Sequence, residues 1–105
     1  MIQHKRRDKI YMISLSCVKP RPGSDKTVYH YRVESNPAKI SFNLFIHFPN
    51  ALILKNRLPE SSLNEILEKK AIEWLDQGIE ETTNIYILPE DILQNPYRPS
   101  GISPA

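Results

Sequence analysis

The feature that most constrains the fold is an alternation over Lys39–Phe48, in which every second residue is large and apolar and only Phe45 breaks the polar series between them. Because successive side chains of a strand point to opposite faces, this pattern predicts a strand with one wholly apolar face. The residues on that face are Ile40, Phe42, Leu44, Ile46 and Phe48. Such a face has to be covered, so another part of the chain must pack on it.

The natural cover is an amphipathic helix, which we predict over Leu63–Gln77. Its apolar stripe has helical spacing and consists of Leu63, Ile66, Leu67, Ala71, Trp74 and Leu75. Ser62 and Glu65 fit a capping box at the start of the helix. Gly78 fits the left-handed residue that ends many helices. We therefore expect this helix to lie across the apolar face of the strand.

Further strands are expected on both sides of the helix. The β-rich segments before it are Ile10–Val18, Thr27–Glu34 and Ala51–Lys55, which Pro, Gly and Asn residues separate. After the helix, Asn84–Leu88 is expected as a short strand and Pro89–Leu93 as one helical turn. The order β-β-β-β-α-β predicts an α+β fold, in which a mostly antiparallel sheet has one amphipathic helix packed on one face.

The chain is short enough for a single domain, which we expect over residues 1–93. Within it, residues 1–9 are expected as a basic N-terminal arm. Residues 94–105 contain three prolines and few apolar side chains, so we expect a mobile tail there.

Charge divides the chain into a basic half and an acidic half. Residues 1–39 hold nine Lys and Arg against three acids, whereas residues 40–105 hold five against nine. The formal net charge of +2 therefore conceals a dipole that can steer a polyanion or bring two copies together. The single cysteine excludes an internal disulfide and favours a cytoplasmic location. No apolar run approaches the ~20 residues of a membrane helix, so no membrane partner is expected.

The leading functional hypothesis is a small non-catalytic accessory or adaptor protein. It would bind another macromolecule, or a second copy of itself, through charged and sheet-edge surfaces. The chain has three glycines, no Gly-rich phosphate loop and no nucleophile elbow. We therefore predict no catalytic residue and no cofactor, and we expect a protein partner or a homo-oligomer.

The alternative hypothesis is a nucleic-acid-binding protein that uses its basic half on phosphates. The candidate residues are Lys5, Arg6, Arg7, Lys9, Lys19, Arg21 and Arg32. Tyr11, Tyr29 and Tyr31 on neighbouring strands would supply rings for base stacking. This hypothesis requires the basic groups to converge on one face of the fold.

Catalysis and metal binding have weaker support in the residue spacing. A metal-independent nuclease would use His30 with Arg32, or Tyr29 with Tyr31, because the members of each pair share one strand face. Cys17, His30 and His47 are metal-ligand types, but no paired-ligand spacing accompanies them, so no metal site is predicted.

Overall fold

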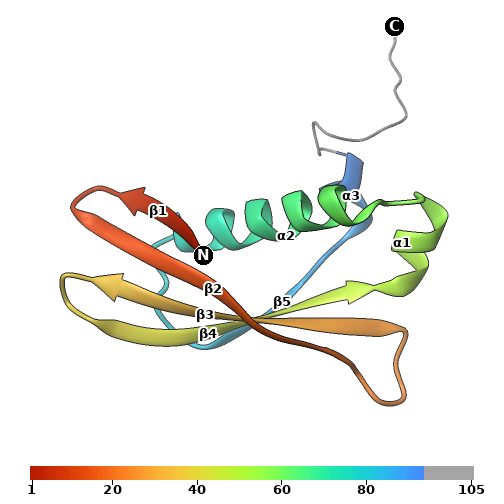
Figure 1. Ribbon diagram of the computed structural model, residues 1–105, viewed down its shortest axis with the longest axis horizontal. Coiled ribbons are helices and arrows are strands. Elements are labelled where there is room, and N and C mark those ends of the chain that lie inside the picture. Colours follow the sequence, from red (N-terminus) through yellow and green to blue (C-terminus); the bar gives the residue numbers. More distant parts are fainter. Residues whose placement is uncertain (94–105) are drawn as a thin grey trace, which may run out of the picture.

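The computed structural model describes residues 1–93 as one five-stranded sheet with three helices (Figure 1). The strands lie in the order β1-β2-β3-β4-β5; the first four are antiparallel and β5 is parallel to β4. The α+β class, the mostly antiparallel sheet and the helix on one face are confirmed. The expected tail, residues 94–105, lies outside the described residues.

The elements follow the chain from β1 to α3. The strands are β1 (Ile2–Arg6), β2 (Lys9–Pro20), β3 (Lys26–Asn36), β4 (Ile40–Pro49) and β5 (Thr83–Tyr86). The helices are α1 (Asn50–Lys55), α2 (Glu60–Leu75) and α3 (Pro89–Leu93). Four strands thus precede the long helix, as expected, although they are not the same four segments.

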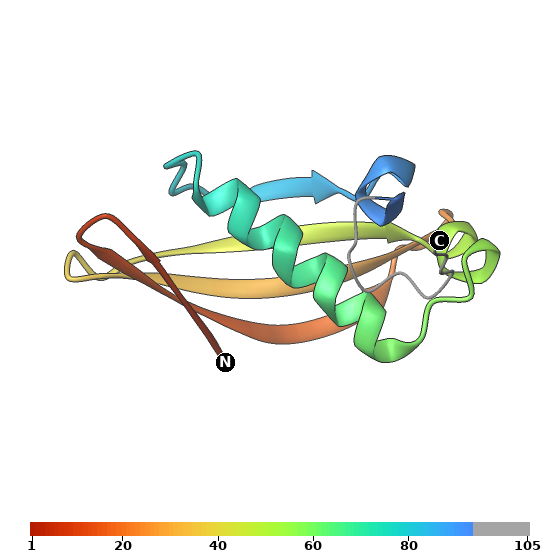
Figure 2. The ribbon, with the colours of Figure 1, turned by 90° about the horizontal axis from the view of Figure 1, so that it is seen from above.

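The core lies between α2 and one face of the sheet, across which α2 runs obliquely (Figure 2). On the predicted apolar face of β4, Phe42, Leu44, Ile46 and Phe48 are buried, each at most 4% exposed, whereas Ile40 at the start of the strand is 42% exposed. On α2, they include Ile66, Leu67, Ala71 and Leu75, with Leu63 and Trp74 partly buried beside them. The predicted packing of the helical stripe on the apolar strand face is therefore confirmed.

The segment Ala51–Lys55, expected as a strand, belongs to helix α1 instead. Its start is held by Asp25 in the β2–β3 loop. The Asp25 carboxylate accepts the N–H of Ala51 at 3.0 Å, and the Asp25 carbonyl accepts the N–H of Asn50 at 2.7 Å. Free N–H groups and a positive dipole end make a helix start a favourable place for such a carboxylate. The prediction was wrong because this cap comes from 26 residues away.

The start of α2 also differs from the prediction. The helix begins at Glu60, with Pro59 as its N-cap and no side-chain capping bond. Ser62 lies inside the helix and is only 5% exposed, so the predicted capping box is wrong. At the other end the helix stops at Leu75 rather than at Gln77. Gly78 is left-handed as expected, with a φ of +79°, and its N–H donates to the carbonyl of Leu75 at 2.9 Å.

The first nine residues, expected as an arm, hold β1 and the turn that leads into β2. β1 is at the edge of the sheet and pairs with β2 from Lys9 to Ile13. Side chains of this hairpin reach the end of α2. His4 Nε2 lies 2.7 Å from a carboxylate oxygen of Asp76, and Arg6 Nε donates to the Asp76 carbonyl at 3.1 Å. These two contacts therefore join the β1–β2 hairpin to the C-terminal end of α2.

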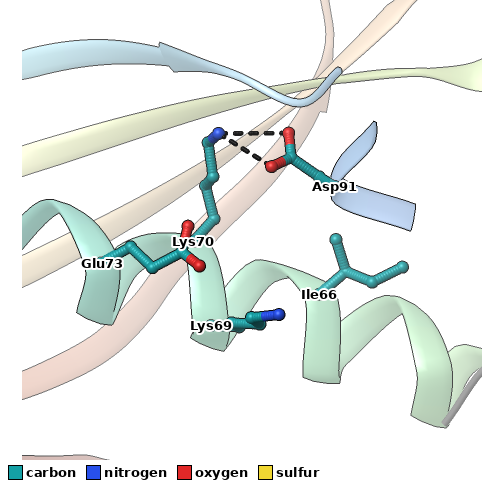
Figure 3. Close-up of a pocket in the computed structure, with 5 residues that line it drawn as sticks. All are labelled: Ile66, Lys69, Lys70, Glu73 and Asp91. Atoms are coloured by element: carbon teal, nitrogen blue, oxygen red, sulfur yellow. Dashed lines mark hydrogen bonds and ion pairs between the residues drawn. The ribbon is translucent and has the colours of Figure 1, made fainter. Parts of the chain in front are cut away.

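The predicted helical turn Pro89–Leu93 is present as α3 and is joined to α2 by an ion pair. Lys70 Nζ lies 3.0 Å from Oδ1 and 3.1 Å from Oδ2 of Asp91 (Figure 3). Asp91 Oδ2 also accepts the N–H of Leu88 at 2.7 Å, which satisfies the start of α3. The hollow beside this pair is about 10 Å³. It has room for about one water molecule and is not a ligand site.

Replacing Leu67 with alanine tests the core. Leu67 is fully buried, so Leu67→Ala should lower the free energy of unfolding by about 2–5 kcal/mol. Asn64→Ala, on the exposed side of the same helix, should change it by less than about 0.5 kcal/mol. Urea unfolding followed by circular dichroism measures both. Equal small effects would contradict the packing described here.

Candidate functional site

The face of the sheet opposite α2 carries no helix within residues 1–93 (Figure 1), and we call it the open face. Strand register arranges its side chains in rows across the sheet. One row contains Cys17, His30, Phe45 and Asn84; the next contains Lys19, Val28, His47 and Tyr86. Arg32 and Asn43 form part of a third row. The open face thus combines aromatic, imidazole, amide and cationic groups.

Two ring pairs stand on the open face. The ring of His30 stacks on Phe45 and that of His47 stacks on Tyr86, each pair with centroids 4.6 Å apart. Tyr86 belongs to the edge strand β5 and is 44% exposed. Each pair joins neighbouring strands, so the rings are held in fixed positions that can receive further flat groups.

Cationic side chains surround these rings. Lys19 and Arg21 line a groove of about 380 Å³ on this face, together with His30, Phe45 and His47. The remaining residues of the groove are Cys17, Pro20, Pro22 and Val28. Lys26 Nζ lies 5.6 Å from the centroid of the Tyr86 ring, a cation–π distance. Arg32 is exposed on the same face, two positions along β3 from His30.

The structure divides the predicted basic set between the two sides of the sheet. Lys19, Arg21 and Arg32 lie on the open face, and Lys5 has the register of that face at the far end of the hairpin. By contrast, Arg6 and Lys9 face the other side and contact Asp76 and Glu80. Arg7 sits at the β1–β2 turn with a φ of +58°. The seven residues therefore do not converge as a group.

Lys26 is a functional candidate that the sequence prediction missed. It has the same parity as Val28, His30 and Arg32 on β3, and this alternation is the signal that could have placed it on their face. The position of the Tyr86 ring beside it depends on β5 pairing with β4, which the local pattern does not reveal.

The tyrosines expected to stack bases lie on the covered side. Tyr11 is fully buried and Tyr31 is 4% exposed, whereas Tyr29 is half-buried against the core. Burial raises the pKa of Tyr31 to about 12, so its hydroxyl remains neutral. The expectation was wrong for Tyr11 and Tyr31, because their parity on the strands faces them toward α2.

One carboxylate gathers three groups on the covered side. Glu80 Oε2 lies 3.0 Å from Lys9 Nζ, 2.9 Å from the Tyr11 hydroxyl and 3.2 Å from the Ser35 hydroxyl. These donors, the lysine foremost, hold the pKa of Glu80 below its usual range against the opposing effect of burial. Glu80 is 13% exposed at its side chain, and the cluster links β2 and β3 to the loop after α2.

A second groove, of about 320 Å³, lies between α2 and β5. Trp74, Asn84 and Tyr86 are among its lining residues. The indole Nε1–H of Trp74 is buried and has no hydrogen-bond partner within the described part of the chain. A buried donor without an acceptor is costly, so the indole of Trp74 is an unsatisfied group next to this groove.

The part of the chain that the structure describes contains no group of three His, Cys, Asp or Glu able to hold a metal ion. Among the same residues, no helix is long and apolar enough to cross a membrane. Comparisons with protein-family models, curated proteins and solved structures give no match. Function therefore has to be inferred from the geometry of the open face and its grooves.

Replacing Glu80 tests the carboxylate cluster. The lowered pKa means that ionised Glu80 stabilises the fold above about pH 4.5, its ordinary value, and this contribution is lost as pH falls through the lowered value. Glu80→Gln should lower the free energy of unfolding by roughly 1–3 kcal/mol at neutral pH. It should also make that free energy fall less steeply below about pH 4.5. Urea unfolding at a series of pH values measures this. Glu81→Gln is the matched control, since Glu81 is exposed.

Proposed function

We propose that this is a non-catalytic binding protein for single-stranded nucleic acid, which it holds across the open face. The observation that carries the proposal is the presence of fixed rings and several cations on one uncovered sheet face. Bases stack on exposed rings while Lys and Arg neutralise the phosphates beside them. Tyr86 is the principal stacking platform, because it is 44% exposed and has Lys26 next to it.

A single strand fits this face better than a duplex. The bases of a duplex are already stacked on one another, whereas unpaired bases are free to lie on protein rings. No helix projects from the open face to enter a groove of duplex DNA within residues 1–93. The cations are distributed along the strands, with Arg32 in one row and Lys19 two rows away. Such an arrangement can follow an extended backbone.

Charge on the opposite side favours the same orientation. Most acids of the second half lie on α2 and in the loop after it, namely Glu60, Glu65, Glu68, Glu73, Asp76, Glu80 and Glu81. A polyanion is repelled from that side and attracted to the other. A cytoplasmic location is part of the proposal, in keeping with the free thiol of Cys17.

Binding of labelled single-stranded DNA and RNA at several salt concentrations tests the proposal. Lys26→Ala and Arg32→Ala should each weaken binding for all sequences and should each reduce the salt slope by about one. Tyr86→Leu should weaken binding about fivefold or more while leaving the salt slope unchanged. Fluorescence anisotropy gives both quantities.

Lys55→Ala is the control for these variants, because Lys55 is exposed on α1 away from the open face. Its affinity should match that of the unchanged protein. Absence of binding at low salt, or equal losses in Lys55→Ala and Lys26→Ala, would contradict the proposal. Stronger binding of duplex than of single strands would contradict the choice of ligand.

An adaptor function at the β5 edge is the second candidate, and the unpartnered Trp74 indole supports it. β5 is a sheet edge, and an added strand there, together with a turn of the Trp74 indole into the adjoining groove, would give the buried Nε1 a carbonyl acceptor. The other edge is less suited to pairing. β2 beyond Ile13 is not covered by β1, but a β-bulge and Pro20 interrupt it.

Self-association is the form of this second candidate that can be measured directly. If two copies join through β5, sedimentation should show a dimer at rising concentration, and Trp74→Phe should weaken that dimer. The reason is that phenylalanine retains the apolar ring and removes the donor. A monomer at every concentration, or a dimer unaffected by Trp74→Phe, would count against it.

A further inference from the structure

On the open face, the side chains of Cys17 and His30 in one row are connected to that of Asn43 in the next. Cys17 Sγ lies 3.8 Å from His30 Nδ1, and His30 Nε2 lies 2.8 Å from Asn43 Oδ1. An amide oxygen only accepts, so the imidazole proton is on Nε2. Nδ1 is therefore left with the lone pair that faces the thiol. This is the arrangement of a nucleophile, a proton acceptor and a group that orients the acceptor.

The position of Cys17 in this row results from a β-bulge in β2. Leu15 pairs with Tyr31 and Cys17 with His30, so Ser16 is the extra residue between them. Bulges re-aim side chains and are frequent beside functional sites. The stacking of His30 on Phe45 then fixes the imidazole from a third side. The thiol and its acceptor are held together by three strands.

Cys17 and His30 both line the groove of about 380 Å³, which has the size of a small-molecule site. Lys19 and Arg21 line the groove, and no Asp or Glu is among its described lining residues. Pro20, Pro22, Val28 and Phe45 supply its apolar wall. A second imidazole, His47, also lines it; this residue is 7% exposed and its Nδ1 has no partner within residues 1–93. The groove thus combines cationic groups with an apolar wall beside the thiol.

We propose that Cys17 is a thiol–disulfide exchange site for small disulfides that carry carboxylates. In the exchange, Cys17 Sγ attacks one sulfur of the disulfide while its proton passes to His30 Nδ1. A new S–S bond forms to Cys17 and the original S–S bond breaks. The departing thiolate takes the proton from His30, so a free small thiol and a mixed disulfide are the products. The small disulfide is the only oxidant required.

Each part of the site has a role in this step. His30 accepts and returns the proton, and Asn43 keeps the imidazole in the tautomer that can do so. Lys19 and Arg21 attract the carboxylates of the disulfide to the groove. The inference goes beyond nucleic-acid binding and does not depend on it, since thiol exchange is measured without any nucleic acid.

The test is the exchange rate of the purified protein with two small disulfides of opposite charge. Oxidised glutathione carries carboxylates and cystamine carries amines. We expect oxidised glutathione to react faster, and mass spectrometry to find one mixed disulfide, absent in Cys17→Ser. His30→Gln should lower both rates by about tenfold or more, because glutamine cannot carry the proton. The double variant Lys19→Ala with Arg21→Ala should lower only the glutathione rate, again by about tenfold.

Circular dichroism shows whether each variant is folded. If His30→Gln is not, Asn43→Ala replaces it: it keeps His30 and removes the acceptor of Nε2–H, and it should lower both rates severalfold. Unchanged rates in a folded His30→Gln or Asn43→Ala protein would overturn the role of the imidazole. Equal loss with both disulfides in the double variant would overturn the preference for carboxylates. Neither result would affect the nucleic-acid measurements.

Discussion

The packing of α2 against the sheet is the interaction on which the rest of the structure depends. Its sixteen residues span about 24 Å, and a single helix of that length can cover only one face of the five strands. Antiparallel sheets tolerate one solvated face, so the remaining strands need no second layer. Within residues 1–93 the opposite face stays open, and its side chains are available for binding.

The same packing converts the charge division of the sequence into a division between two sides of the molecule. The basic half forms β1 to β3, whereas the acids of the second half lie mainly on α2 and the following loop. Where the two halves meet, the ammonium of Lys9 pairs with the carboxylate of Glu80, and Arg6 donates to the backbone carbonyl of Asp76. Within residues 1–93, the cations on the other side of the sheet form no ion pair, although Glu34 lies on the same face. The excess positive charge is consequently displayed on the open face.

The elements that could be predicted are those whose pattern is local. The apolar face of β4, the stripe of α2 and the left-handed Gly78 all follow from short-range periodicity and turn chemistry. The elements that were missed depend on distant partners. The start of α1 depends on Asp25, which comes from another loop. β1 consists mainly of polar residues without an apolar pattern of their own, and it is recognisable as a strand only from its pairing with β2. The site was only partly foreseen for the same reason, because Lys26 and Tyr86 are brought together by β5 pairing.

The bulge in β2 shows how strongly the open face depends on register. In a regular strand, Cys17 would share a face with Ile13 and Leu15, and would point toward the covered side. The extra residue, Ser16, reverses the parity of everything after it. Cys17 and Lys19 are thereby moved to the open face, and Val18 takes the covered side. One inserted residue therefore supplies the face with both its thiol and one of its cations. Alternation alone could not have placed these two residues, because nothing in Leu15-Ser16-Cys17 marks which residue will be left unpaired.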